Sequence, residues 1–179
     1  MPVMLRVRPS LLHRLFYPQV PAILSASHRG KISAMPVVSY ASVSDAPPLV
    51  AVACNPSSFT CKLALRARSF SLSLVDRAHL GAMERLATTS GSSAADKLAD
   101  AGLHHRRGAA SHVPVVAEAQ ATLECKLNSK HKLGDHLLLV GLVEAAYTSK
   151  AFSDFWDFHR YKPILYTGWR EGMSTYEGP

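Results

Sequence analysis

The segment "KLGDHLLLVGLV", residues 132–143, places a Gly-Asp-His triplet directly before a run of apolar residues. The run that begins at Leu137 is apolar at consecutive positions, which is typical of a strand buried on both faces. The triplet is typical of a turn, and it puts two ionisable side chains, Asp135 and His136, at the start of that strand. The segment therefore predicts a central strand of a sheet or barrel with polar groups at its mouth.

Two further segments show the alternating pattern of a strand with one side in water. Residues 117–127, "AEAQATLECKL", carry apolar residues at every odd position and polar residues at every even position. Residues 70–75, "FSLSLV", alternate apolar side chains with serine. Because alternate residues of a strand share a face, both segments are predicted to be half-buried strands.

Residues 20–54 are predicted to form three strands separated by two turns. The residues Arg29–Lys31, "RGK", supply a glycine-containing hairpin turn between two apolar runs. The prolines in "DAPP", residues 45–48, mark a break before the third strand at 49–54. The N-terminal third of the chain is therefore expected to contribute strands rather than helices.

Helices are predicted at three places by their capping residues. Asn55 can cap a helix that has Pro56 at its first position, where the missing amide hydrogen has no helical partner in any case. Asp76 is a second predicted cap. A short helix is expected around Lys97–Ala101, and Gly102 can end it.

The order of these segments indicates a mainly β protein with a few helices. Regular alternation of strands and helices is absent, and six predicted strands with few helices favour a closed barrel with covering helices. With 179 residues, of which 47% are hydrophobic, one domain spanning 1–179 is expected. Within it, 1–16 is predicted to be an N-terminal extension, 103–114 an exposed loop, and the aromatic-rich 147–179 a core lid or a subunit contact.

Composition limits the class of partner and the compartment. The formal net charge of +7 would suit a polyanion, but the basic residues are dispersed, so nucleic-acid binding is not expected. The nine histidines and three cysteines lack the spacings of a zinc site, and no metal is predicted. The cysteines include no close pair in sequence, which favours a reducing cytoplasm. Because neither a secretory signal pattern nor a run of about 18 apolar residues is visible, a soluble cytoplasmic protein without membrane contact is expected.

The segment "NPSSFT", residues 55–60, is the candidate site for an anion. Neither the dinucleotide-binding glycine fingerprint nor the P-loop lysine motif occurs in the chain. If a helix starts at Asn55, the free amides of the following residues and the positive end of the helix dipole could hold a phosphate without glycines. Plain helix capping explains the same residues, and both interpretations stay open from the residues alone.

Several blocks of the chain, taken in order, resemble the flavin reductase-like, FMN-binding split-barrel proteins. The blocks are "YPQVPAILSAS", "ASVSDAPPLVAVACNPSSFT", "RSFSLSLV", "AADKLADAG" and "LGDHLLLVGLV", which together span about residues 17–143. That family includes the small reductase components of two-component flavin monooxygenases, flavoredoxin and archaeal ferric reductase. The resemblance implies a six-stranded FMN-binding split β-barrel.

The resemblance also implies where a flavin would bind. The ring would lie against residues 38–44, and the phosphate on the stretch that begins at Cys54. Lys97 would approach the flavin or its phosphate, Asp135 would shape the turn, and His136 would stand where nicotinamide stacks and act in catalysis. The implied cofactor-binding residues are Val38, Ser39, Tyr40, Ala41, Ser42, Val43, Ser44, Cys54, Asn55, Pro56, Ser57, Ser58, Thr60, Lys97 and Asp135.

The function implied by the resemblance is NAD(P)H-dependent flavin reduction in a homodimer. FMN would be the cofactor, FAD a possible substrate, and NADPH or NADH the hydride donor. Reduced flavin would pass to a flavin-dependent monooxygenase or to ferric acceptors. A second hypothesis is a non-enzymatic FMN-binding electron carrier, and a third is a nucleic-acid-binding barrel. The basic segment 104–107 is a candidate for the ribose phosphate of NADPH, with an ordinary solvated surface as the alternative.

Overall fold

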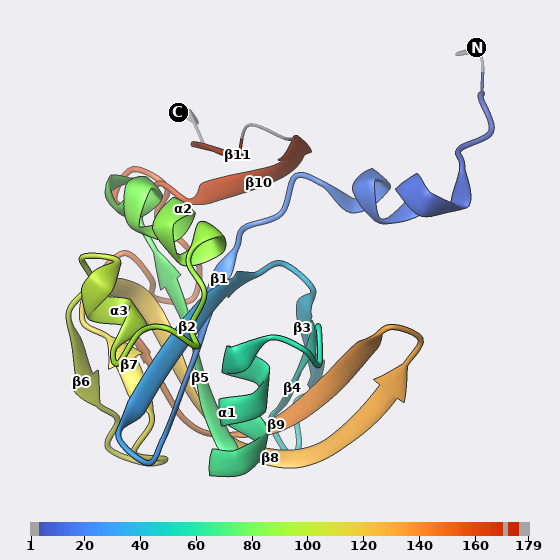
Figure 1. The fold of residues 1–179 in the computed structure, drawn as a ribbon. Coiled ribbons are helices and arrows are strands. Elements are labelled where there is room, and N and C mark those ends of the chain that lie inside the picture. The colour runs from blue at the N-terminus through green and yellow to red at the C-terminus, as the bar shows by residue number, and fades with distance from the viewer. Residues whose placement is uncertain (1–3, 170–171, 176–179) are drawn as a thin grey trace.

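The computed structural model describes residues 4–169 and 172–175, and its centre is a sheet of seven antiparallel strands (Figure 1). The spatial order is β2-β1-β5-β8-β9-β4-β3. The bounds are β1 (Ala22–His28), β2 (Lys31–Val37), β3 (Tyr40–Ser44), β4 (Leu49–Cys54), β5 (Ser69–Val75), β8 (Ala119–Leu133) and β9 (His136–Thr148).

The two edges of this sheet are joined by only two residues of chain. β2 ends at Val37 and β3 begins at Tyr40, so Val38 and Ser39 bring the edge strands together. The carbonyl of Ser39 accepts a hydrogen bond from the amide of Ala53 in β4, at 2.8 Å. The sheet therefore curls into a barrel that is open between β2 and β4.

The predicted mainly β split barrel is confirmed, and its sheet has one strand more than the six expected. The additional strand is β3, which pairs with β4 from Tyr40 to Ser44. Neither Val38 nor Ser39 is a turn-forming glycine or proline, so the break between β2 and β3 has no sequence signal.

Helices and short hairpins cover the barrel. The helices are α1 (Phe59–Ala67), α2 (Leu80–Thr88), α3 (Lys97–Asp100) and the 3-10 helices η1 (Pro9–Phe16) and η2 (Arg77–His79). Two short hairpins complete the described chain: β6 (His105–Arg107) with β7 (Pro114–Val116), and β10 (Ile164–Trp169) with β11 (Gly172–Thr175). Among the residues that the structure describes, no helix is long and apolar enough to cross a membrane.

The core has two parts, one inside the barrel and one under the helices α2 and α3. The first is built around Val52, Phe70 and Leu139, and α1 adds Leu63 to it. The second contains the completely buried side chain of Met83, together with Leu98 from α3. The second part also joins α2 and α3 to β1 and β2, through Ile23 and Ala34.

Two turn predictions from the sequence are confirmed. His28 pairs with Lys31, and the two residues between them, Arg29 and Gly30, have positive φ angles of 51° and 76°. Such a turn matches the twist of the flanking strands. In the Gly-Asp-His triplet, Gly134 has a φ of 57° and the triplet turns the chain into β9.

β9 is the predicted central strand, since it lies between β8 and β4. Leu139 and Gly141 are buried on its inner face. On the other face Leu138, Val140 and Leu142 are only half-buried in the isolated chain. The prediction of burial on both faces therefore holds for one face only.

The prediction that β5 is half-buried is wrong. Ser71 and Ser73 are completely buried, and Leu72 between them is only 4% exposed. The hydroxyl of Ser71 donates to the carbonyl of Pro114 at 2.6 Å, and the hydroxyl of Ser73 lies 3.1 Å from that of Thr122. The serine face is covered by β7, and its hydroxyl groups are satisfied by β7 at Ser71 and by β8 at Ser73.

The prediction of one wet face on β8 is also wrong in the first half of the strand. Thr122 and Glu124 are buried, and only from Lys126 onward do the polar positions become exposed. The Glu124 carboxylate lies under the segment 103–114, which was expected to be an exposed loop. That segment instead folds back as the β6–β7 hairpin and covers the strand.

The two ends of the chain differ from each other in burial. In the N-terminal extension, Leu15 and Phe16 are 64% and 72% exposed, and η1 stands away from the barrel (Figure 1). In the C-terminal tail, Tyr161 and Ile164 are buried, whereas Phe155 is 83% exposed. The tail is therefore partly a core element, and its residues 170–171 and 176–179 lie outside the described part.

Candidate functional site

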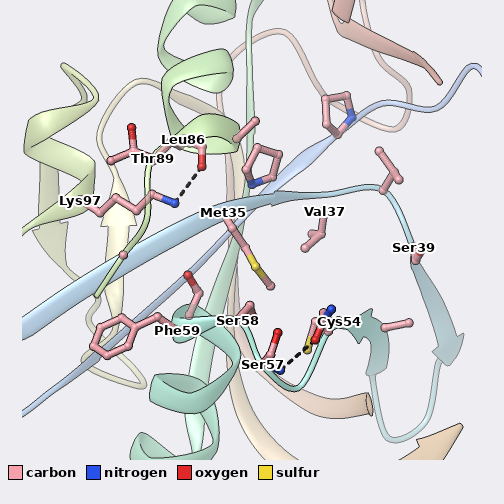
Figure 2. A pocket seen from close by; sticks show the side chains of 18 of the residues that line it. Met35, Val37, Ser39, Cys54, Ser57, Ser58, Phe59, Leu86, Thr89 and Lys97 are labelled. Carbon is pink, nitrogen blue, oxygen red and sulfur yellow. Dashed lines mark hydrogen bonds between the residues drawn. The ribbon is translucent and has the colours of Figure 1, made fainter. Parts of the chain in front are cut away.

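A cavity of about 730 Å³ lies where the barrel is open (Figure 2). Its walls come from the ends of β2 and β4, the link 38–39, Asn55 and residues 57–60, and residues 86–87 and 89–92 around the end of α2. His136 adds a side chain from the start of β9. A volume of this size is typical of pockets for cofactors and small molecules.

Helix α1 begins three residues later than the sequence predicted. Its N-cap is Ser58, whose hydroxyl oxygen accepts a hydrogen bond from the amide of Cys61 at 3.2 Å. Asn55 instead accepts from the amide of Ser57 at 2.8 Å, which makes a tight turn before the helix. The predicted helix start at Asn55 and Pro56 is therefore wrong.

The first turn of α1 still presents free donors. Among the described residues, no hydrogen bond is made by the backbone amides of Phe59 and Thr60. Orphan amides at a helix start carry partial positive charge and bind anions. The hydroxyl of Thr60, by contrast, is buried and lies 2.9 Å from the hydroxyl of Ser33 in β2. Thr60 can therefore offer its main-chain amide, but not its hydroxyl, to a ligand.

Lys97 brings a buried positive charge to the same cavity. Its side chain is only 5% exposed, and its ammonium donates to the carbonyl of Leu86 at 2.8 Å. Burial lowers the pKa of Lys97. Within the described chain no carboxylate lies within ion-pair distance of this ammonium. A buried cation with two unused donors strongly favours an anionic ligand.

His136 is held in position by its neighbour in the turn. Its Nδ1 lies 2.7 Å from the Asp135 carboxylate, and this hydrogen bond lowers the pKa of Asp135. An ionised carboxylate only accepts, so Nδ1 carries the proton and Nε2 is left for another partner. Asp135 itself points to solvent, with its side chain 92% exposed.

The cavity brings together most, but not all, of the predicted binding residues. Those that line it are Val38, Ser39, Cys54, Asn55, Ser57, Ser58, Thr60, Lys97 and His136. Those that do not are Tyr40, Ala41, Ser42, Val43, Ser44, Pro56 and Asp135.

The residues after Ser39 leave the cavity because they form strand β3. Tyr40 packs against the barrel core, and its hydroxyl donates to the carbonyl of Val20 at 2.8 Å. Burial raises the pKa of Tyr40 to about 12. The pairing of β3 with β4 thus separates Tyr40–Ser44 from the link that lines the pocket.

Sequence reasoning missed one whole wall of the cavity. Residues 86–87 and 89–92 line it, together with Met35–Val37 from β2. The glycine-serine stretch that contains Gly91 was a usable signal. A Cβ atom at Gly91 would overlap the side chain of Ser33, so glycine allows this loop to approach β2 closely.

Comparison with known proteins agrees with this architecture. The family model described as "Flavin reductase like domain" matches residues 12–167. An FMN-binding protein from Thermus thermophilus, solved with bound 1-cyclohex-2-enone, is 28% identical, with a TM-score of 0.82 and complete coverage of both chains.

Two relatives are similar in sequence. The reductase component of a 4-nitrophenol 4-monooxygenase/4-nitrocatechol 2-monooxygenase from Rhodococcus opacus is 32% identical over 69% of this chain. An uncharacterised protein of Aeropyrum pernix is 31% identical over 92% of this chain. The chain spans 63% of the length of each of these two relatives.

The antiparallel barrel with a cavity at its open side defines an FMN-binding split-barrel fold. Since the family model matches more than half of the residues, the chain belongs to the flavin reductase-like domain family.

Proposed function

We propose that the protein binds FMN in this cavity and reduces it with a nicotinamide nucleotide. The observation that carries the proposal is the buried Lys97 ammonium, which has no carboxylate partner in the described chain and lines the cavity that also contains the start of α1. The phosphate of FMN is a dianion, and it would receive donors from Lys97 and from the amides of Phe59 and Thr60.

The remaining walls fit the ring of a flavin. Met35, Val37 and Val38 line the cavity with apolar side chains. Figure 2 shows the Met35 side chain pointing toward the loop of Ser57 and Ser58, with Val37 beside it. An apolar wall next to a cluster of polar donors is the arrangement that an amphipathic cofactor requires.

When bound, the flavin supplies the hydride-accepting chemistry, and the protein supplies position. His136 lies at the mouth of the cavity with Nε2 free, because Asp135 holds Nδ1. In this position its ring would orient the nicotinamide without transferring a proton. Such positioning by one group contributes on the order of 1–2 kcal/mol to the transition state.

The test is anaerobic stopped-flow mixing of the FMN-loaded protein with NADH or NADPH. We expect rapid loss of the flavin's visible absorbance without any added reductase. In the His136→Ala variant we expect the reduction rate to fall about tenfold, or roughly 1.4 kcal/mol, while FMN stays bound. His131→Ala is the matched control, because His131 lies in the same hairpin and does not line the cavity.

Bleaching that needs an added reductase would instead support the alternative, an FMN-binding electron carrier. Wild-type rates in His136→Ala would show that this histidine does not position the nicotinamide. The choice between NADH and NADPH is measured in the same experiment.

The basic segment 104–107, the candidate for the ribose phosphate of NADPH, lies away from the first cavity. It contributes Arg106 and Arg107 to a second cavity of about 540 Å³, which shares no lining residue with the first.

The names of the relatives suggest which acceptors the reduced flavin would have. Similarity to a reductase component supports a flavin-dependent monooxygenase as partner. FAD as a diffusible substrate and ferric chelates as acceptors are further candidates within the same proposal. The three free cysteines favour a reducing cytoplasm as the location.

We further propose that the protein is a homodimer. Apolar side chains are exposed at the tip of the β8–β9 hairpin, where Leu133 is 53% exposed, and along the N-terminal extension at Leu15 and Phe16. The half-buried outer face of β9, at Leu138 and Val140, adds to this surface. Apolar patches of this kind mark contacts between subunits.

Light scattering is expected to give a mass near twice the 19.4 kDa of the chain. Replacing Leu138 and Val140 with lysine should convert the dimer to monomer, because two charges would enter the contact. A monomeric wild-type protein across a range of concentrations would contradict the proposal.

A further inference from the structure

Two cysteines that sequence spacing did not pair are in contact, and one of them, Cys54, lines the cavity. The sulfur atoms of Cys54 and Cys61 lie 2.9 Å apart, and both side chains are buried. This separation exceeds the length of a disulfide bond by only about 0.9 Å. The two residues meet although seven positions separate them in sequence, because the turn at 55–58 folds the end of β4 back onto the start of α1.

The pair encloses the loop that presents the free amides. Cys54 is the last residue of β4, lines the cavity and also lies 3.7 Å from the carbonyl of Leu137 (Figure 2). Cys61 lies in the first turn of α1, where the amide groups of the helix favour negative charge. The chain between the two cysteines is the segment 55–60.

The two thiols are electronically unequal. The hydrogen bond that the Cys54 thiol donates to Cys61 raises the pKa of Cys54 and lowers the pKa of Cys61. A thiolate at Cys61 is the nucleophile needed for disulfide chemistry, and the helix start stabilises it. The third cysteine, Cys125, has a pKa that burial raises to about 12, and among the described residues its sulfur contacts neither of the other two.

We propose that Cys54 and Cys61 form a dithiol/disulfide couple that exchanges an electron pair with the flavin of this cavity. The inference rests on the proposed function, which supplies the flavin. In the reductive direction the disulfide accepts two electrons and its S–S bond breaks. The two sulfurs take up two protons, one released by the reduced flavin and one from solvent, and the flavin is oxidised. In the oxidative direction the same electrons and protons return.

The couple is first tested on flavin-free protein, so the result does not depend on flavin binding. The full chain is equilibrated anaerobically with mixtures of oxidised and reduced dithiothreitol, quenched in acid, unfolded, alkylated and analysed by peptide mass. We expect the ratio of disulfide to dithiol at Cys54–Cys61 to rise tenfold for each tenfold rise in the dithiothreitol ratio. Cys125→Ala should titrate identically, and Cys61→Ser should form no disulfide at Cys54. Two thiols at every ratio would overturn the proposal.

Electron exchange is then measured by mixing oxidised protein anaerobically with one equivalent of reduced FMN. We expect one flavin oxidised for each disulfide lost, and none with Cys61→Ser. FMN affinity is measured separately by equilibrium dialysis. Protein that binds FMN but leaves the reduced flavin unoxidised refutes the exchange alone. Protein that binds no FMN refutes the proposed function, and with it the exchange, whatever the thiol titration shows.

Discussion

Lys97→Met is expected to weaken FMN binding by about 10- to 150-fold while leaving the affinity for riboflavin nearly unchanged. The reason is that a hydrogen bond to a charged oxygen is worth about 1.5–3 kcal/mol, and riboflavin lacks the phosphate that would accept it. Methionine keeps the length and the buried apolar stem of the lysine side chain. The measurement is the ratio of the two dissociation constants, obtained by quenching of flavin fluorescence.

The riboflavin comparison separates loss of a phosphate contact from damage to the fold. Lys97 also pairs with the carbonyl of Leu86, near the end of α2, and that carbonyl loses its partner in the variant. Damage of this kind would weaken both ligands equally. Lys31→Met is the matched control, since Lys31 is exposed and does not line the cavity. Equal loss of FMN and riboflavin affinity, or no loss of either, would contradict a phosphate contact by Lys97.

Glu124→Gln is expected to lower the free energy of unfolding by about 3 kcal/mol. The carboxylate is completely buried, and its two oxygens accept hydrogen bonds from three backbone amides, those of Ala109, Ala110 and Ser111, at 2.8–3.0 Å. A glutamine places an NH₂ group against at least one of these amides, and each buried donor left unpaired costs about 1–3 kcal/mol. Urea unfolding followed by circular dichroism measures the change.

A loss of this size corresponds to a Tm lower by roughly 6–12 °C for a domain of this length. Glu84→Gln is the control, because Glu84 lies exposed on α2 and its carboxylate has no comparable role. We expect its effect to stay within about 0.5 kcal/mol. If Glu124→Gln were as stable as the control, the three amides would not depend on the carboxylate.

Much of the fold could be predicted because its signals are local. The glycine turn at Arg29–Gly30, the apolar run of β9 and the short helix at Lys97 each depend on residues adjacent in sequence. Two of the failures share one cause. Ser71 and Glu124 are polar residues in alternating strands, and they are buried because the segment 103–114 folds over them and supplies hydrogen bonds. The alternation of these polar residues with apolar ones does not indicate that another segment of the chain covers them.

The candidate site also has a part that the sequence predicted and a part that it did not. Residues 54–60, Lys97 and His136 could be proposed from the sequence because the blocks that contain them follow one another as in the resembled family. The exclusion of Tyr40–Ser44 from the cavity was decided by the pairing of β3 with β4, which the link at Val38 does not signal.

By itself the sequence determined the mainly β class and the positions of most strands along the chain. Periodicity and turn residues act over a few positions, and that is sufficient for each of these features. Only the tertiary structure decided that Lys97 is buried without a carboxylate partner in the described chain, and that Cys54 touches Cys61. Burial and contact depend on which distant segments pack over a side chain, and no local pattern of residues encodes that.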